Sequence, residues 1–248
     1  MIGAWLNRWL PTAASAHAAR FDGVLAAAHT EGGLIFLGWL AFLVVMLVRF
    51  RHRPGRATSR PAGRVWPLLA VAAIVAGDVW LLAGSALPAW FARAVPAPAG
   101  AAEVRVIGEQ FAWNVHYPGF DGRFGRTDRA FISAADPLGI DRDDPSAKDD
   151  FVLIGVLTVP VGRPTVVHLT SKDVIHSFTL ATMRVKQDVT PGLPVSTWFT
   201  PVGTGQWEVG CSQLCGLGHY RMRALLDVKS EAEWRAFVSD EIARLENP

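Results

Sequence analysis

The chain has 248 residues, of which half are hydrophobic and only 19% are charged. A soluble domain carries nearer one quarter charged residues, so the apolar surplus indicates membrane-spanning segments, and it excludes a disordered chain or a collagen-like fibre. Two cysteines are too few for a disulfide scaffold, and a formal net charge of +2 predicts no nucleic-acid partner.

Residues 1–30 are expected to form an N-terminal segment outside the membrane. The small residues at 14–20 (ASAHAAR) faintly resemble a signal-peptide cleavage site. The apolar run before them is short and is interrupted by Asn7 and Arg8. Retention and removal of this segment therefore both remain open at this stage.

Residues 31–95 are predicted to form a two-helix transmembrane hairpin. Residues 32–48 carry no charge, and residues 65–91 are apolar apart from Asp78, so each run is long enough to cross a bilayer. Residues 49–64 hold six arginines and no acid, and the positive-inside rule places this loop in the cytoplasm and both termini outside. A buried hairpin of a soluble protein is the alternative, which the lengths and the arginine loop disfavour.

Residues 96–230 are predicted to form an all-β sandwich or barrel, because Pro and Gly punctuate short β-forming runs. The runs are residues 104–107, 111–117, 151–159, 165–171, 176–180, 196–200, 205–209 and 222–228. Residues 118–150 form a long loop with eight Asp, four Arg and one Lys, either a docking face for a basic partner or a solvated insertion. Ser230 and Glu233 form a capping-box pattern that predicts a helix over residues 231–248.

Residues 211–222 (CSQLCGLGHYRM) concentrate the metal-binding chemistry. Two thiols (Cys211, Cys215), the imidazole of His219 and the thioether of Met222 form a soft donor set that favours copper. Zinc seldom recruits a methionine, and an iron–sulfur cluster needs four thiolates. A Cys211–Cys215 disulfide is the main alternative, but it leaves His219 and Met222 unexplained.

His176, at the start of a predicted strand, supplies a further donor. A pair of coppers bridged by two cysteines needs a terminal imidazole for each metal, which His176 and His219 provide. The backbone carbonyl of Gln213 can fill the axial position that Met222 leaves open.

The sequence resembles subunit II of the haem–copper cytochrome c oxidases in their bacterial form, over nearly the whole chain. The matching segments are GEQFAWNVHYPGFDGRFGRTD (108–128), DPLGIDRDDPSAKDD (136–150), SKDVIHSFTLATMRVKQDVTPG (171–192) and CSQLCGLGHYRM (211–222). The resemblance implies a two-helix hairpin followed by a cupredoxin-like β-sandwich that carries a dinuclear copper centre, CuA. The copper ligands that it implies are His176, Cys211, Gln213 (carbonyl), Cys215, His219 and Met222.

The implied function is the electron-accepting subunit of a terminal respiratory oxidase. It would take electrons from cytochrome c and pass them to the haem of subunit I, where oxygen is reduced to water and protons are translocated. The chain itself would transfer electrons only, with subunits I and III and membrane lipid as partners and with haems confined to the partner subunit. The implied location is the inner (plasma) membrane, as a multi-pass protein with its C-terminal domain on the periplasmic side. The alternatives are the CuA subunit of a nitrogen-oxide reductase and a metal-free structural subunit as in quinol oxidases, which lacks the copper ligands present here.

Three positions depart from the family pattern. Gln213 replaces a glutamate that helps to hold magnesium against subunit I, and a neutral side chain is a poorer magnesium ligand. Phe111 stands where the family has the tryptophan at which electrons enter, so Phe111 or Trp113 is the candidate for that role, and simple packing is the alternative. Asp78, midway along the second apolar run, is expected to be protonated or paired, either in a proton-conducting contact with subunit I or in one interhelical hydrogen bond.

Overall fold

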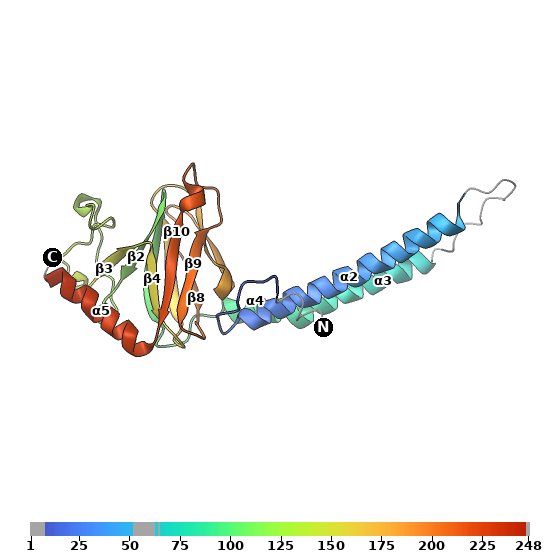
Figure 1. Cartoon of the computed structure of the whole chain (residues 1–248), viewed down its shortest axis with the longest axis horizontal. Helices are drawn as coiled ribbons and strands as arrows, with labels where there is room; N and C mark the ends of the chain where they lie inside the picture. The colour runs from blue at the N-terminus through green and yellow to red at the C-terminus, as the bar shows by residue number, and fades with distance from the viewer. Residues whose placement is uncertain (1–7, 52–62, 64, 247–248) are drawn as a thin grey trace. The chain divides into compact units, whose positions relative to one another are not determined.

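The computed structural model describes residues 8–51, 63 and 65–246 (Figure 1). Contacts within the chain divide it into two compact units. One unit contains the helices of residues 20–96, and the other combines residues 11–19 with residues 97–248. Most of the arginine-rich loop predicted at 49–64 lies outside the described residues.

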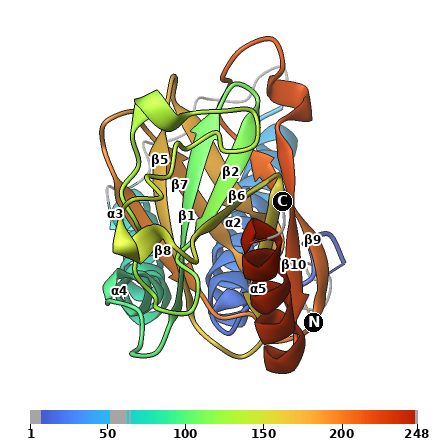
Figure 2. The ribbon, with the colours of Figure 1, turned by 90° about the vertical axis from the view of Figure 1, so that its left-hand side faces the viewer.

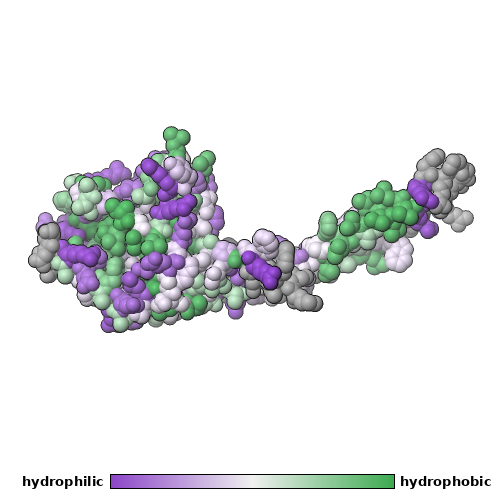
Figure 3. Space-filling view, in the orientation of Figure 1, coloured by the Kyte–Doolittle hydropathy of each residue, from purple (hydrophilic) through white to green (hydrophobic). Residues whose placement is uncertain are grey.

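The helical unit presents apolar side chains outward along its length. Its helices are α2 (Ala18–Arg49), α3 (Val65–Leu81), the π-helical turn η1 (Leu82–Ala86) and α4 (Leu87–Ala94). The last three run on without a break, so the described residues contain two helices that are long and apolar enough to span a membrane, and their most apolar stretches are exposed. Figure 3 shows a continuous apolar patch in green on part of the helical unit. Helix α2 begins well before the uncharged run at residues 32–48.

Asp78 lies midway along its own apolar helix but level with one end of the uncharged run of α2. A side chain added at the neighbouring Gly77 would overlap the carboxylate of Glu31 on α2. Glu31 directly precedes the uncharged run of α2, at residues 32–48. Because the two helices are level at this contact, Asp78 lies beside the outer end of that run and not at its centre.

The second unit is a sandwich of two five-stranded sheets. The first sheet has the order β3-β2-β1-β5-β8, and the second has the order β4-β10-β9-β6-β7 (Figure 2). The strands are β1 (Ala102–Glu109), β2 (Ala112–Tyr117), β3 (Phe151–Ile154), β4 (Val156–Pro160), β5 (Thr165–Ser171), β6 (His176–Leu180), β7 (Val185–Val189), β8 (Val195–Phe199), β9 (Gly205–Cys211) and β10 (Arg223–Lys229). The pairs β1–β5 and β4–β10 are parallel, and the other pairs are antiparallel.

The single strand predicted at residues 151–159 is two strands, one in each sheet. Gly155 divides them with a φ of 73°, a conformation that glycine adopts without steric cost. Its N–H donates to the carbonyl of Trp113 in the first sheet, and its carbonyl accepts from Leu225 in the second. The chain therefore crosses from one sheet to the other at Gly155.

The core lies between the two sheets. Alternate residues of β5 are buried, as a strand with one face on a core requires. Trp113, Phe178 and Phe199 are the largest fully buried side chains among the described residues. The ring of Trp113 lies edge-on to that of Phe178, with 5.6 Å between ring centroids.

The loop at residues 118–150 is folded onto the sandwich. Most of its aspartates accept hydrogen bonds from backbone N–H groups, and Asp136 alone accepts three, at 2.7–3.0 Å. The carboxylate of Asp150 is fully buried and lies 2.6 Å from Nε2 of the equally buried His116 on β2. The carboxylates of this loop thus serve mainly to hold its own backbone.

Both ends of the β unit are tied to the sandwich. Residues 11–19 make backbone hydrogen bonds to the segment of the sandwich that follows β8. In addition, Ser15 Oγ donates to the carbonyl of Met183 at 2.8 Å. At the other end, helix α5 (Glu231–Glu246) packs the ring of Phe237 against Tyr117 and Phe151. The hydroxyl of Ser230 and the side chain of Glu233 make the reciprocal bonds of a capping box, which confirms that prediction.

Candidate metal centre

Three adjacent strands of the second sheet bring the predicted donors together. His176 is the first residue of β6, and Cys211 is the last residue of β9. These strands are antiparallel neighbours, with Phe178 opposite Cys211. Met222 directly precedes β10, which pairs with the other side of β9, and its carbonyl accepts from the N–H of Cys211. Donors from distant parts of the sequence therefore meet at one end of the sheet.

The sulfur atoms lie at the centre of the donor group. The two Sγ atoms are 3.9 Å apart, and both cysteines are free. Cys211 Sγ lies 3.9 Å from His176 Nδ1 and 3.2 Å from the carbonyl oxygen of Gln213. Cys215 Sγ lies 3.6 Å from Nδ1 of His219 and 3.7 Å from Sδ of Met222. All six predicted groups are thus in one place, and the thiols do not form the alternative disulfide.

Asp173 orients the imidazole of His176. Its Oδ1 lies 2.9 Å from His176 Nε2, so the imidazole donates there and its Nδ1 lone pair faces the sulfurs. Partial burial pushes the pKa of Asp173 upward, but hydrogen bonds from His176, Gln110 and Val174 bring it below its ordinary value. The carboxylate is therefore kept in its charged, accepting form.

The Cys215 thiol is less acidic than a free cysteine. Burial, and after it the neighbouring thiol of Cys211, together raise the pKa of Cys215 to about 11. Two thiols this close cannot both ionise cheaply without a cation between them. We therefore expect both thiols to ionise to thiolates when a soft metal ion binds.

The two aromatic candidates for electron transfer occupy different places. Trp113 is fully buried, and its ring lies 5.9 Å from that of His176, centroid to centroid. Phe111 is half-buried and packs on the loop that carries Cys215, close enough that a side chain at Gly216 or Gly218 would meet its ring. A molecule docking from solvent can therefore touch Phe111 but not Trp113.

Two residues next to the donors were not predicted from the sequence. Asp173 stands within the segment SKDVIHSF, three residues before His176, and that spacing between an acid and a histidine was the available signal. Gln110 donates from its side chain to the carbonyl of Cys215, across 105 residues of sequence. No local pattern indicates such a contact.

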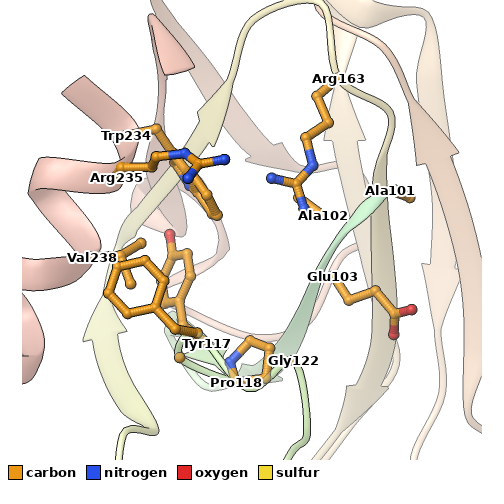
Figure 4. Close-up of a pocket in the computed structure, with 12 residues that line it drawn as sticks. Ala101, Ala102, Glu103, Tyr117, Pro118, Gly122, Arg163, Trp234, Arg235 and Val238 are labelled. Carbon is orange, nitrogen blue, oxygen red and sulfur yellow. The ribbon is translucent and has the colours of Figure 1, made fainter. Parts of the chain in front are cut away.

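A cavity of about 300 Å³ lies elsewhere on the β unit, between α5 and the first sheet (Figure 4). Its lining includes Tyr117, Trp234, Arg163 and Arg235, and none of the six donor residues. Both arginines lie within 4 Å of the same carboxylate, that of Glu231. The cavity is thus separate from the candidate metal centre.

The β unit matches a known family. The family model described as cytochrome c oxidase subunit II, periplasmic domain, covers residues 102–229. The chain belongs to this family. The two-helix hairpin followed by a cupredoxin-like sandwich, predicted from the sequence, is confirmed.

Two curated relatives match a larger share of the chain than the family model does. The alternative cytochrome c oxidase subunit 2 of Bradyrhizobium diazoefficiens is 36% identical over 84% of this chain and 76% of its own length. Cytochrome c oxidase subunit 2 of Cereibacter sphaeroides is 27% identical over 83% of this chain and 72% of its own. The crystal structure of the periplasmic domain of subunit II (CoxB) from Bradyrhizobium japonicum has a TM-score of 0.45 and 28% identity, and covers 60% of this chain and 99% of that one.

Membership of the subunit II family indicates where the helices and the sandwich lie. The chain is a membrane protein of a haem–copper oxidase complex, with its C-terminal domain on the outer side. Copper is the metal expected for the family, and the His and Cys donors described above form a candidate site for it.

Proposed function

We propose that this subunit II accepts electrons from cytochrome c at a dinuclear CuA centre and passes them to the haem of subunit I, where oxygen is reduced to water. The observation that carries this proposal is the convergence of six donor groups of the right chemistry at one end of the second sheet. The chain would transfer electrons only, and the chemistry of oxygen would belong to the partner subunit.

The donor set fits copper. Two thiolates, two imidazoles, a thioether and a backbone carbonyl are the soft and borderline ligands that copper prefers, and no carboxylate competes among them. The proposed ligands are His176, Cys211, Gln213 (carbonyl), Cys215, His219 and Met222. A dinuclear copper centre would supply, when bound, a one-electron redox couple.

The protein's part is to hold this donor set still. His176, Cys211 and Met222 are fixed by paired strands, and Asp173 locks the tautomer of His176. Because the framework is a sandwich with a packed core, the donors have little freedom to rearrange when the charge of the centre changes. Such rigidity favours rapid transfer of electrons in and out.

Phe111 offers a docked donor a partly exposed aromatic ring beside the loop of Cys215. Its half-exposed ring contacts the loop of Cys215, whereas Trp113 is buried in the core beside His176. We therefore place the docking site of cytochrome c beside Phe111, with Trp113 as internal packing for the imidazole.

The remaining parts of the proposal follow from the family. The subunit would sit in the inner membrane as a two-span protein, beside subunits I and III. Gln213 offers an amide where the family's magnesium site has a carboxylate, so we propose that any magnesium at the interface with subunit I is held mainly by other groups.

The test is anaerobic mixing of reduced cytochrome c with the copper-loaded full chain in detergent. We expect each chain to take one electron, seen as oxidation of the cytochrome haem, and no oxidation with the Cys215→Ser variant. A chain that binds copper but leaves cytochrome c reduced would contradict the proposed donor. Salt should slow the reaction if the acidic loop at residues 118–150 guides a basic donor.

A further inference from the structure

The turn between β1 and β2 touches both halves of the donor group. This turn consists of Gln110 and Phe111, and it follows the last two residues of β1, Gly108 and Glu109. One half of the donor group is the part around His176, and the other half is the loop that carries Cys215. These two parts are far apart in the sequence. The β1–β2 turn therefore lies where the two halves have to be held in register.

Gln110 makes one hydrogen bond to each half. Its backbone N–H donates to Oδ2 of Asp173 at 2.7 Å, and Asp173 in turn holds His176. Its side-chain Nε2 donates to the carbonyl oxygen of Cys215 at 2.6 Å. One residue thus connects the carboxylate behind His176 to the backbone of a cysteine.

The backbone that Gln110 holds has a demanding conformation. Gly216, directly after Cys215, has a φ of 134°, a value that side-chain-bearing residues rarely adopt. A Cβ atom at Gly216 would lie 2.8 Å from Nε2 of Gln110 and 3.1 Å from the ring of Phe111. The turn at Gly216 reverses the chain, so that His219 and Met222 lie close to Cys215. The Gln110 amide and the Phe111 ring hold the turn from one side.

Gly108 brings strand β1 into contact with the half of the donor group that contains His176. A Cβ atom at Gly108 would lie 2.9 Å from Cδ2 of His176 and 3.2 Å from the ring of Trp113. The backbone of β1 is thus in direct contact with the imidazole. Any shift of this strand would move the supports of both halves together.

We propose that Gln110 is a positioning residue for the CuA centre, because its amide fixes the carbonyl of Cys215 relative to the Asp173–His176 pair. The proposal rests on the proposed function for its metal, but the contact itself belongs to the chain without metal. Loss of the amide donor releases the Cys215 turn, which changes the geometry of the bound metal pair and exposes the Cys215 thiol in the metal-free chain.

The first measurement is the rate at which iodoacetamide alkylates Cys215 in the metal-free full chain. It is made in a Cys211→Ser background, where Cys215 is the only thiol. Gln110→Met keeps the length of the side chain but cannot donate, and Gln110→Glu keeps its shape but is ionised at neutral pH. Both variants should be alkylated about three- to tenfold faster, which is the loss expected for one hydrogen bond. Gln206→Met, at an exposed glutamine of β9 that bonds Asp227, is the matched control and should leave the rate unchanged.

The second measurement is made on the copper-loaded full chain. Gln110→Met and Gln110→Glu should shift the visible absorption and the reduction potential of the centre while near-ultraviolet circular dichroism stays native, and Gln206→Met should shift neither. Unchanged alkylation and spectra in both Gln110 variants would overturn the proposal. A change in Gln110→Met alone would also overturn it, because shape and not donation would then be responsible. If the unmodified chain fails to bind two coppers, the proposed function fails, and the alkylation rates still decide the role of Gln110.

Discussion

The buried pair of His116 and Asp150 gives a quantitative test of how the long polar loop is held. Nε2 of His116 lies 2.6 Å from Oδ2 of Asp150, and the two side chains are 1% and 0% exposed. The same carboxylate oxygen accepts from the N–H of Gly125 at 2.8 Å, and Arg142 donates to the carbonyls of Ala147 and Asp150. The pair therefore joins the end of the loop to β2.

Replacing one partner leaves the other buried without its main hydrogen bond. Removing one member of a buried pair costs about 3–5 kcal/mol of folding free energy. With a urea m-value of about 2 kcal/mol/M, the unfolding midpoint of the β unit should fall by about 1.5–2.5 M in Asp150→Leu or in His116→Leu. The double variant should cost less than the sum of the two single variants by at least about 1 kcal/mol, because each single change already breaks the bond.

The assay is urea unfolding of the full chain in detergent, followed by near-ultraviolet circular dichroism. Asp143→Leu, at an exposed aspartate of the same loop, is the matched control and should stay within about 0.5 kcal/mol of the unmodified chain. Single variants that cost less than about 1 kcal/mol, or costs that add without coupling, would refute the reasoning.

Three further changes probe other contacts. Gly218→Ala should lower the copper content of the loaded chain, because its methyl group would overlap the ring of Phe111; adding Phe111→Ala should restore part of it, and metal analysis measures both. Ser15→Ala should lower the free energy of unfolding of the β unit by about 1 kcal/mol, since it removes a buried hydrogen bond of 2.8 Å; an unchanged urea midpoint would show that this side-chain bond does not stabilise the sandwich. The hydroxyl of Ser230 holds the pKa of Glu233 below its usual value. The unfolded state therefore takes up the proton first, and stability contributed by Glu233 above pH about 4.5 is lost as the pH falls through the lowered value. Glu233→Gln should flatten this acid limb of the stability curve, and an unaltered limb would contradict the assignment.

Much of the strand pattern was predictable because burial on one face leaves a local signature. The expected strands at residues 165–171 and 176–180 coincide with β5 and β6. Strand β7 (Val185–Val189) was missed because only its two end residues are buried and its interior, Lys-Gln-Asp, reads as polar. The crossing at Gly155 was missed because a continuous apolar run does not reveal which sheet each half joins.

The donors of the candidate metal centre were predictable by their chemistry, and their supports were not. Two cysteines, a histidine and a methionine within residues 211–222 are rare enough to indicate a metal. Gln110, by contrast, is an ordinary polar residue until β1 is placed beside β5 and the loop of Cys215. The pairing of His116 with Asp150 likewise depends on how a loop of 33 residues, 118–150, folds back onto β2.

The most direct test of the central claim is the copper content of the purified full chain together with its electron paramagnetic resonance spectrum. The proposed function predicts two coppers per chain and a hyperfine pattern in which one unpaired electron is shared equally by two copper nuclei. Cys211→Ser should abolish that shared pattern. A single copper with the hyperfine pattern of one nucleus, or a copper-free chain with Cys211 joined to Cys215 by a disulfide, would contradict the claim.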